Sequence, residues 1–151
     1  NPDYTASLVN ELRYKNFDLR VQLDAVQGVD VWNADWRTRQ GVGSGEVAAR
    51  EHRGELPRGY IAGIYAIEEW RIDDGSFVKL REVSLAYHLG KIKGFNDITL
   101  SIGGRNLISW DNYKGYDPEV NARGQSTILR GIDFGAVPIP RTYSFGVAAK
   151  F

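Results

Sequence analysis

Residues 17–25 read Phe-Asp-Leu-Arg-Val-Gln-Leu-Asp-Ala, a strict alternation of apolar and polar side chains. A β-strand places successive side chains on opposite faces, so this stretch predicts a strand with one apolar and one charged face. The apolar face carries Phe17, Leu19, Val21, Leu23 and Ala25, and the charged face carries Asp18, Arg20, Gln22 and Asp24. The clearest pattern in the chain therefore indicates β-structure.

The same period of two recurs in four other stretches, which are residues 5–14, 82–89, 98–110 and 141–151. Lys15-Asn16 lies between the first two strands and predicts a tight turn, so the chain should open with a hairpin. We therefore expect an all-β fold made of antiparallel strands.

Two long connections interrupt the alternation. From about residue 33 to residue 57 no period of two is visible, and this length is unusual for a loop inside a compact domain. Within it, residues 41–45 predict a flexible segment and residues 46–53 a short helical turn. Residues 60–72 are compatible with a strand or a short helix. The second long connection runs from about residue 111 to residue 140.

Short and long connections thus alternate along the chain, as they do in outer-membrane barrels with tight periplasmic turns and long extracellular loops. In such a barrel the apolar faces contact lipid and the charged faces line a wet lumen. Every backbone group in lipid must be paired within the protein, so the strands must belong to a closed barrel. About five strands cannot close one, since eight already make a narrow barrel. The remaining strands should come from chain outside this sequence or from other copies.

The composition excludes several classes of protein. Nineteen basic residues balance nineteen acidic ones, whereas a nucleic-acid binder normally carries a basic stripe. The absence of cysteine excludes a disulfide framework and cysteine metal sites. No apolar run approaches the roughly 18 residues of a spanning helix, which excludes a helical membrane protein. The 151 residues contain no methionine, and we expect them to be a fragment of a longer precursor.

The last strand carries a second signal. Its apolar residues alternate strictly with small or polar ones, and the sequence stops at an aromatic side chain. Bacterial outer-membrane barrels typically end in this way, and the strand then serves as an assembly signal. The residues of this predicted signal are Tyr143, Phe145, Val147 and Phe151. An ordinary amphipathic edge strand is the alternative, and with it a soluble or surface β-sandwich that binds carbohydrate or mediates assembly.

Four motifs in the same order resemble the SusC/RagA-like TonB-dependent transporters. Asp74–Tyr87 is similar to the family's strand that begins Asp-Gly-Ser-Phe, and Gly104–Leu107 resembles its Gly-x-Asn-Leu segment. Tyr113–Asn121 is close to its loop with Asp-Pro-Glu-Val. Gly131–Tyr143 resembles the run Gly-x-Asp-x-Gly followed by Pro-x-Pro-Arg-x-Tyr that precedes the final strand. Residues 34–60 match no part of this pattern.

The resemblance implies that residues 1–151 are the C-terminal segment of a transmembrane barrel of about 22 strands. The N-terminal plug and the other strands would lie outside this sequence. The family works in the bacterial outer membrane, in contact with its lipid, is energised by TonB through the plug, and carries a SusD-like lipoprotein as a lid. It imports oligosaccharides and sometimes peptides. The resemblance thus implies an importer and not an enzyme.

Few residues invite a chemical role. The carboxylates of the segment Tyr116, Asp117, Pro118 and Glu119 could pass for a catalytic pair, but proline and glycine nearby favour a structural turn held by Asx-type hydrogen bonds. His52 and His88 have no ligand spacing around them, and no phosphate-binding loop is present, so we expect no metal and no cofactor.

The four tryptophans lie at strand ends or loop starts, where a membrane protein uses them as interfacial anchors. Stacking on sugar rings is the functional alternative. Trp36 and Trp70 flank the unmatched loop, and they are the candidates for contact with substrate or lid.

Overall fold

The computed structural model describes residues 1–92, 94–122 and 131–150, and it divides into two compact units. The sheet unit consists of Tyr4–Val26, Phe77–Trp110 and Ile139–Phe151. The loop unit consists of Asn1–Asp3, Gln27–Ser76 and Asp111–Pro138. Both long connections of the sequence therefore fold together into one compact body.

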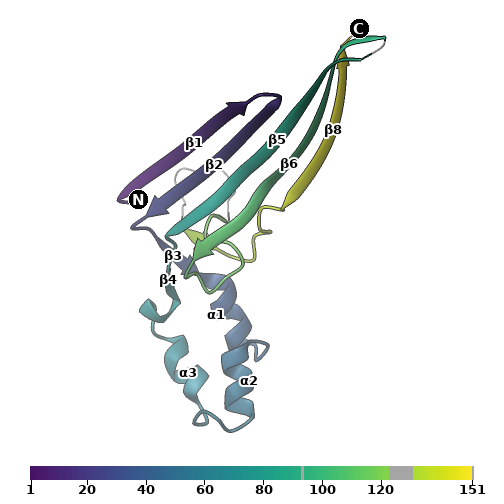
Figure 1. Cartoon of the computed structure of the whole chain (residues 1–151). Coiled ribbons are helices and arrows are strands. Elements are labelled where there is room, and N and C mark those ends of the chain that lie inside the picture. The colour runs from purple at the N-terminus through teal and green to yellow at the C-terminus, as the bar shows by residue number, and fades with distance from the viewer. Residues whose placement is uncertain (93, 123–130, 151) are drawn as a thin grey trace. The chain divides into compact units, whose positions relative to one another are not determined.

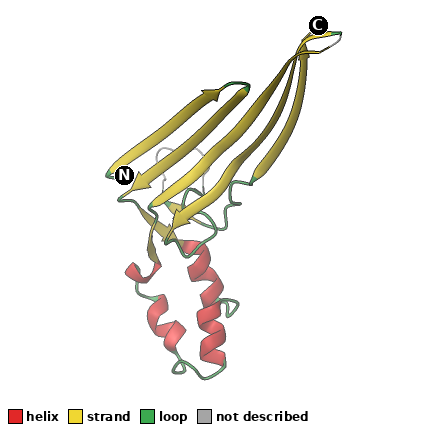
Figure 2. Cartoon of the chain, viewed as in Figure 1, coloured by secondary structure: helices red, strands yellow, loops and turns green. Residues whose placement is uncertain are grey.

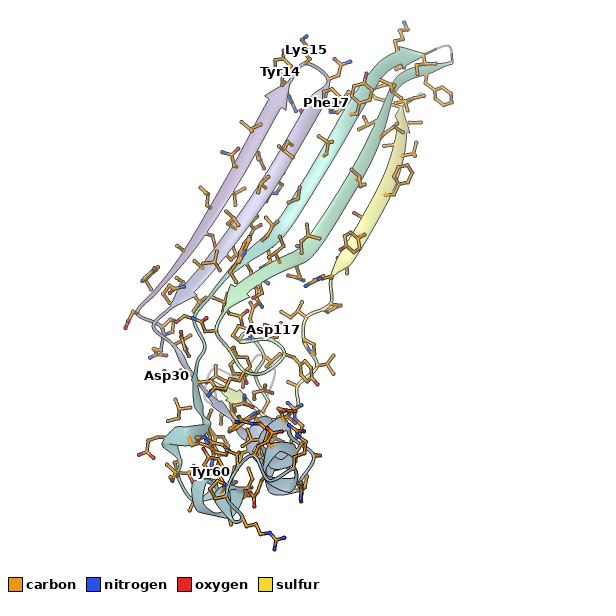
Figure 3. All side chains as sticks on the ribbon, turned by 60° about the horizontal axis from the view of Figure 1, so that its bottom comes forward. Tyr14, Lys15, Phe17, Asp30, Tyr60 and Asp117 are labelled. Carbon is orange, nitrogen blue, oxygen red and sulfur yellow. The ribbon has the colours of Figure 1, made fainter. Side chains whose placement is uncertain are left out.

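Five antiparallel strands form the sheet unit, and Figure 1 shows them side by side. Their spatial order is β1 (Tyr4–Tyr14), β2 (Phe17–Gln27), β5 (Phe77–Ile92), β6 (Phe95–Asp111) and β8 (Thr142–Lys150). The predicted hairpin is confirmed, with its turn at Lys15-Asn16, and Figure 3 shows Tyr14, Lys15 and Phe17 gathered at this turn. All five predicted strands are present, and β5 is longer than expected because it begins at Phe77.

A β-bulge explains why the sequence pattern missed the start of β5. The register with β2 shifts between Gln22, which pairs with Glu82, and Leu23, which pairs with Leu80. Arg81 is the extra residue, so Arg81 and Glu82 both serve the charged face while Leu80 stays on the apolar face. The apolar positions of the strand accordingly change from even numbers before the bulge to odd numbers after it.

The apolar face of the sheet is open along its length. Leu8 in β1 is 61% exposed, Ile102 in β6 60% and Phe145 in β8 75%. Ile102 pairs with Phe145 across β6 and β8, so these side chains share one face. A β-sandwich would bury such a face under a second sheet. No second sheet covers it among the described residues of the sheet unit, and the sandwich alternative is therefore wrong.

The opposite face carries three rows of paired polar groups, and each row crosses β1, β2, β5 and β6. We call them charge rows. In the first, Asp24 accepts hydrogen bonds from Ser7 Oγ (2.9 Å) and Arg81 Nε (2.8 Å), and Arg81 also donates to Asn106 Oδ1 (3.0 Å). These pairs link side chains that lie on neighbouring strands, which is the unit of stabilisation in a sheet.

The second charge row joins Glu11, Arg20, Glu82 and Arg105 by ion pairs in that order. In the third row, Asp18 accepts a hydrogen bond from Arg13 Nε at 2.7 Å and lies 3.0 Å from His88 Nε2. The other ring nitrogen of His88, Nδ1, lies 3.0 Å from Thr99 Oγ1. Charged and polar groups on this face thus satisfy one another along the width of the sheet.

Asn106 of the Gly-x-Asn-Leu motif has a backbone role. Its φ of 53° lies in the left-handed region, which asparagine tolerates better than most residues. Besides accepting from Arg81, its side chain donates through Nδ2 to the carbonyl of Pro140 at 3.2 Å. The motif therefore supplies a residue that tolerates this backbone conformation in β6 and holds the chain that leads into β8.

The loop unit is mainly helical. From β3 (Asp30–Asn33) the chain enters α1 (Ala34–Gly41), α2 (Glu46–His52), α3 (Tyr60–Tyr65) and the 3-10 helix η1 (Glu69–Arg71), drawn in red in Figure 2. It returns through β4 (Ile72–Asp74). The predicted helical turn at residues 46–53 is present as α2. The ambiguous stretch 60–72 is mostly helical.

Residues 42–45 connect the end of α1 to the start of α2, with Gly45 as the N-cap of α2, and the flexibility predicted for residues 41–45 stays a prediction. No helix of the described residues is long and apolar enough to cross a membrane.

A small three-stranded sheet lies at the base of the helices. β3 pairs with β4 antiparallel and with β7 (Ile132–Asp133) in parallel, so the parallel pair joins Asn33 to Asp133 in register. This sheet brings the second long connection against the first.

Candidate functional site

Buried polar side chains gather around the small sheet of the loop unit. Asn33 is fully buried, and Asp73 and Asp133 are almost so. Together with Tyr113 and Lys114 they form a cluster that we call the polar junction. Buried polar groups of this kind persist in folded proteins only when their hydrogen bonds are satisfied.

Asn33 uses both ends of its side-chain amide. Its Oδ1 accepts the N–H of Trp36 at 2.9 Å and so caps the first turn of α1, and its Nδ2 donates to Asp73 Oδ2 at 2.9 Å. Asn33 precedes α1 and Asp73 follows η1, so this one bond closes the base of the whole helical segment. The sequence forms the helix here because asparagine is among the best N-cap residues.

Asp73 also ties the two long connections to each other. Its Oδ1 lies 2.8 Å from Lys114 Nζ, and the ammonium group of Lys114 lies 5.6 Å from the centre of the Trp36 ring. The carboxylate is almost fully buried, whereas Lys114 is more than half exposed. The ion pair therefore anchors the second connection through a buried acceptor.

Asp133 is the second buried carboxylate. It accepts the Tyr113 hydroxyl at 2.7 Å through Oδ2 and the N–H of Gly135 at 3.1 Å through Oδ1. Burial, followed by the hydrogen bond to Asp133, raises the pKa of Tyr113 far above its ordinary value. Each carboxylate of the polar junction thus has its own donors, and the cluster is built for structure rather than for proton transfer.

Alkaline solution should loosen the polar junction. The folded pKa of Tyr113 lies above its unfolded value of about 10, so the stabilisation is complete below that pH and is lost as the pH rises through the folded pKa. We expect the denaturant midpoint of the loop unit, followed by tryptophan fluorescence, to fall above about pH 10. Tyr113→Phe should lower the midpoint at pH 8 and remove this additional alkaline loss. An equal alkaline fall in both proteins would contradict the assignment.

The loop motif has the geometry of a turn. Asp117 is buried, and its Oδ1 accepts the N–H of Glu119 at 3.0 Å, which is the hydrogen bond of an Asx turn. Pro118 is buried, Glu119 is exposed, and Tyr116 is 75% exposed beneath the guanidinium of Arg39. Asp117 and Glu119 therefore do not converge on a common ligand position.

The two candidate contact residues meet. The rings of Trp36, in α1, and Trp70, in η1, lie 4.0 Å apart between centroids at an interplanar angle of 55°. Each tryptophan remains partly exposed. Trp32 lies in β3 of the loop unit and Trp110 at the end of β6 in the sheet unit, where it is 52% exposed.

The other predicted residues are spread over the chain. Tyr143, Phe145 and Val147 of the predicted assembly signal point from the exposed apolar face of β8, and Phe151 lies outside the described residues. His88 belongs to a charge row, and His52 ends α2. In the described part of the chain, no group of three or more His, Cys, Asp or Glu residues could hold a metal ion.

Sequence reasoning missed Asn33, Asp73 and Asp133. The sequence held a partial signal for Asp133, because it lies between Gly131 and Gly135. Both glycines adopt a positive φ of 71° in the structure. Asn33 and Asp73 left no such signal, since their partnership depends on a fold that brings positions 40 residues apart together.

Comparison with known proteins identifies relatives of this chain. No family model matches the sequence. TonB-dependent receptor P3 of Formosa agariphila is 32% identical over 174 aligned positions, and TonB-dependent receptor P26 of the same organism is 28% identical over 169. Each alignment covers 99% of this chain, but only 16% and 17% of the two relatives, so the chain spans about a sixth of their length.

Solved structures show the same fold. The RagAB peptide importer matches with a TM-score of 0.71 and 18% identity in its open-open state, and with 0.73 and 19% in its closed-closed state. Both matches cover 100% of this chain and 17% of the importer chain. In sequence, the chain therefore corresponds to a portion of TonB-dependent receptors, and its fold is that of a portion of the RagAB importer chain.

Proposed function

We propose that this chain forms the last strands of the barrel wall of a bacterial outer-membrane importer, together with two of its extracellular loops. One observation carries the proposal. The sheet unit is a single layer whose apolar face is exposed while its opposite face is paired in charge rows. A wall between lipid and a wet lumen needs these two faces.

The likeness to TonB-dependent receptors and to the RagAB peptide importer supports the rest of the proposal. The whole protein would import oligosaccharides or peptides, would be energised by TonB through a plug outside this sequence, and would work with a SusD-like lipoprotein. The apolar face would contact outer-membrane lipid. None of these steps requires enzymatic chemistry from the described residues.

Neighbouring positions in β8 give a direct test of the two faces. The sequence has no cysteine, so Phe145→Cys and Ser144→Cys can each carry a single nitroxide label in the full-length protein, with any cysteines elsewhere replaced. In lipid bilayers we expect the label at 145 to collide with oxygen and to be shielded from a water-soluble nickel chelate. The label at 144 should behave in the opposite way. Equal access of the nickel chelate to both labels would exclude the proposed wall.

We also propose that the Trp36–Trp70 pair contacts the imported substrate or the lid. Both rings lie in the helical segment of the loop unit and keep part of their surface exposed. The double variant Trp36→Ala/Trp70→Ala should lower uptake about tenfold without lowering the amount of assembled barrel. Trp110→Ala is the control for loss of an exposed tryptophan and should leave uptake per assembled barrel unchanged. Unchanged uptake in the double variant would refute the contact.

A further inference from the structure

An open pocket of about 510 Å³ lies among helices α1, α2 and α3 of the loop unit. Its walls are mainly small or apolar, with Ala48, Ile61 and Ala62 on two of the helices and the side of the Tyr65 ring. This volume falls within the usual range of small-molecule sites, which combine apolar walls with a few placed polar groups. Three polar side chains, Gln40, Glu51 and His52, also line the pocket, and hydrogen bonds within the loop unit fix the first two.

Gln40 presents a donor without an acceptor. It is only 2% exposed, and its Oε1 accepts the N–H of Ala48 at 3.0 Å, which fixes the orientation of the side-chain amide. Nε2 donates to none of the described residues. A Cβ at position 45 would lie 2.1 Å from Gln40 Oε1 and would collide with the side-chain amide. The glycine at this position therefore leaves the space that the amide of Gln40 occupies. Nε2 keeps contact with solvent, so an incoming ligand can supply the acceptor.

Glu51 presents an acceptor. Its two oxygens receive the N–H groups of Gly59 (2.7 Å) and Ile61 (2.8 Å), and these hydrogen bonds hold the pKa of Glu51 below its ordinary value. The carboxylate is therefore ionised at neutral pH, and each oxygen keeps a lone pair for a further donor. The pocket thus offers one N–H donor from α1 and one carboxylate acceptor from α2, with the imidazole of His52 beside them.

We propose that this pocket binds a secondary amide. The amide carbonyl accepts from Gln40 Nε2, the amide N–H donates to Glu51, and the small apolar substituent rests on Ala48 and Ala62. Such a group occurs in a peptide bond and in the acetamido group of an amino sugar. Binding follows from the pocket alone, whereas a role for the pocket in capturing imported cargo rests on the proposed function.

Calorimetric titration of the detergent-purified full-length protein tests the proposal with three probes. They are N,N′-diacetylchitobiose, N-acetyl-trialanine amide, and cellobiose, which lacks the amide. We expect saturable binding of at least one amide probe and none of cellobiose. Binding of the chitobiose derivative alone identifies an acetamido sugar, and binding of the peptide alone identifies a peptide. Binding of both identifies the amide itself.

Three variants locate the binding. Gln40→Glu keeps the acceptor for Ala48 and removes the free donor, so it should weaken the amide probe at least tenfold. Ala62→Leu adds bulk to the pocket while keeping both Gln40 and Glu51 in the sequence, and it should abolish binding, which keeps the test decisive if Gln40→Glu disturbs α2. Ala66→Leu, at the end of the same helix and outside the pocket, is the control and should bind normally.

The proposal is overturned if neither amide probe binds, if cellobiose binds equally well, or if Ala62→Leu retains full affinity. These outcomes are independent of the nitroxide test on β8, because binding to the purified protein requires no transport. The calorimetric titration thus tests the amide site, and the nitroxide labels on β8 separately test the proposed membrane wall.

Discussion

Replacing Val147 with arginine is expected to reduce the assembled protein in the outer membrane far more than replacing its neighbour Ala148 with arginine. Val147 is 63% exposed on the apolar face of β8 and pairs with Leu100 of β6. Arginine on a lipid-facing position near the middle of a bilayer costs about 2–4 kcal/mol. A loss of this size exceeds a tenfold change in the folding equilibrium.

Ala148 is the matched control because it lies one position along the same strand and faces the other side. It pairs with Thr99, which belongs to a charge row, so an added guanidinium there meets polar groups. The heat-dependent shift of folded barrel on a gel, normalised to total protein, measures the difference. Equal folded fractions for the two arginine variants would mean that lipid does not contact this face.

Asn33→Ala should destabilise the helical segment by about 2–4 kcal/mol, the sum of a lost helix cap and of a buried carboxylate deprived of a donor. The barrel itself should still assemble, because Asn33 belongs to the loop unit. Trypsin added to intact cells should then cut at Arg37 and Arg39 much faster than in the parent protein. Hydrogen exchange of the Trp36 amide, which Asn33 accepts, should rise with it.

Two further variants sharpen the result. Asn33→Asp keeps an acceptor for Trp36 but sets a second carboxylate against Asp73, so it should be no more stable than Asn33→Ala. Thr38→Ala is the control, since the exposed Thr38 only donates to the carbonyl of Ala34 within its own helix. Parent-like protease resistance in Asn33→Ala would show that the polar junction does not hold the helices.

The strands could be predicted from the sequence because each of the two faces meets a uniform environment. A period of two then survives along β1, β2, β6 and β8, and it located the hairpin, β6 and the last strand. The start of β5 could not be found in this way, because the bulge at Arg81 changes which positions are apolar. Two adjacent polar residues between apolar runs were the available signal.

The loop unit was less predictable for a physical reason. Its helices are short, and their ends are fixed by side chains from elsewhere, such as Gln40 for α2 and Glu51 for α3. A periodic sequence pattern cannot reveal a helix cap whose side chain comes from another helix. The loop motifs were recognisable as turns, but the partnership of Asn33 with Asp73 required the folded structure.

The ion pair between Lys114 and Asp73 makes the two long connections of the loop unit interdependent. A chimaera that exchanges only residues 34–71 keeps both Asp73 and Lys114, and it should fold like the parent protein. A chimaera that exchanges only residues 111–138 replaces Lys114 and leaves the buried carboxylate of Asp73 without this cation. Engineers who wish to retarget such a receptor should therefore transplant both loops as one cassette, or leave this pair of residues untouched.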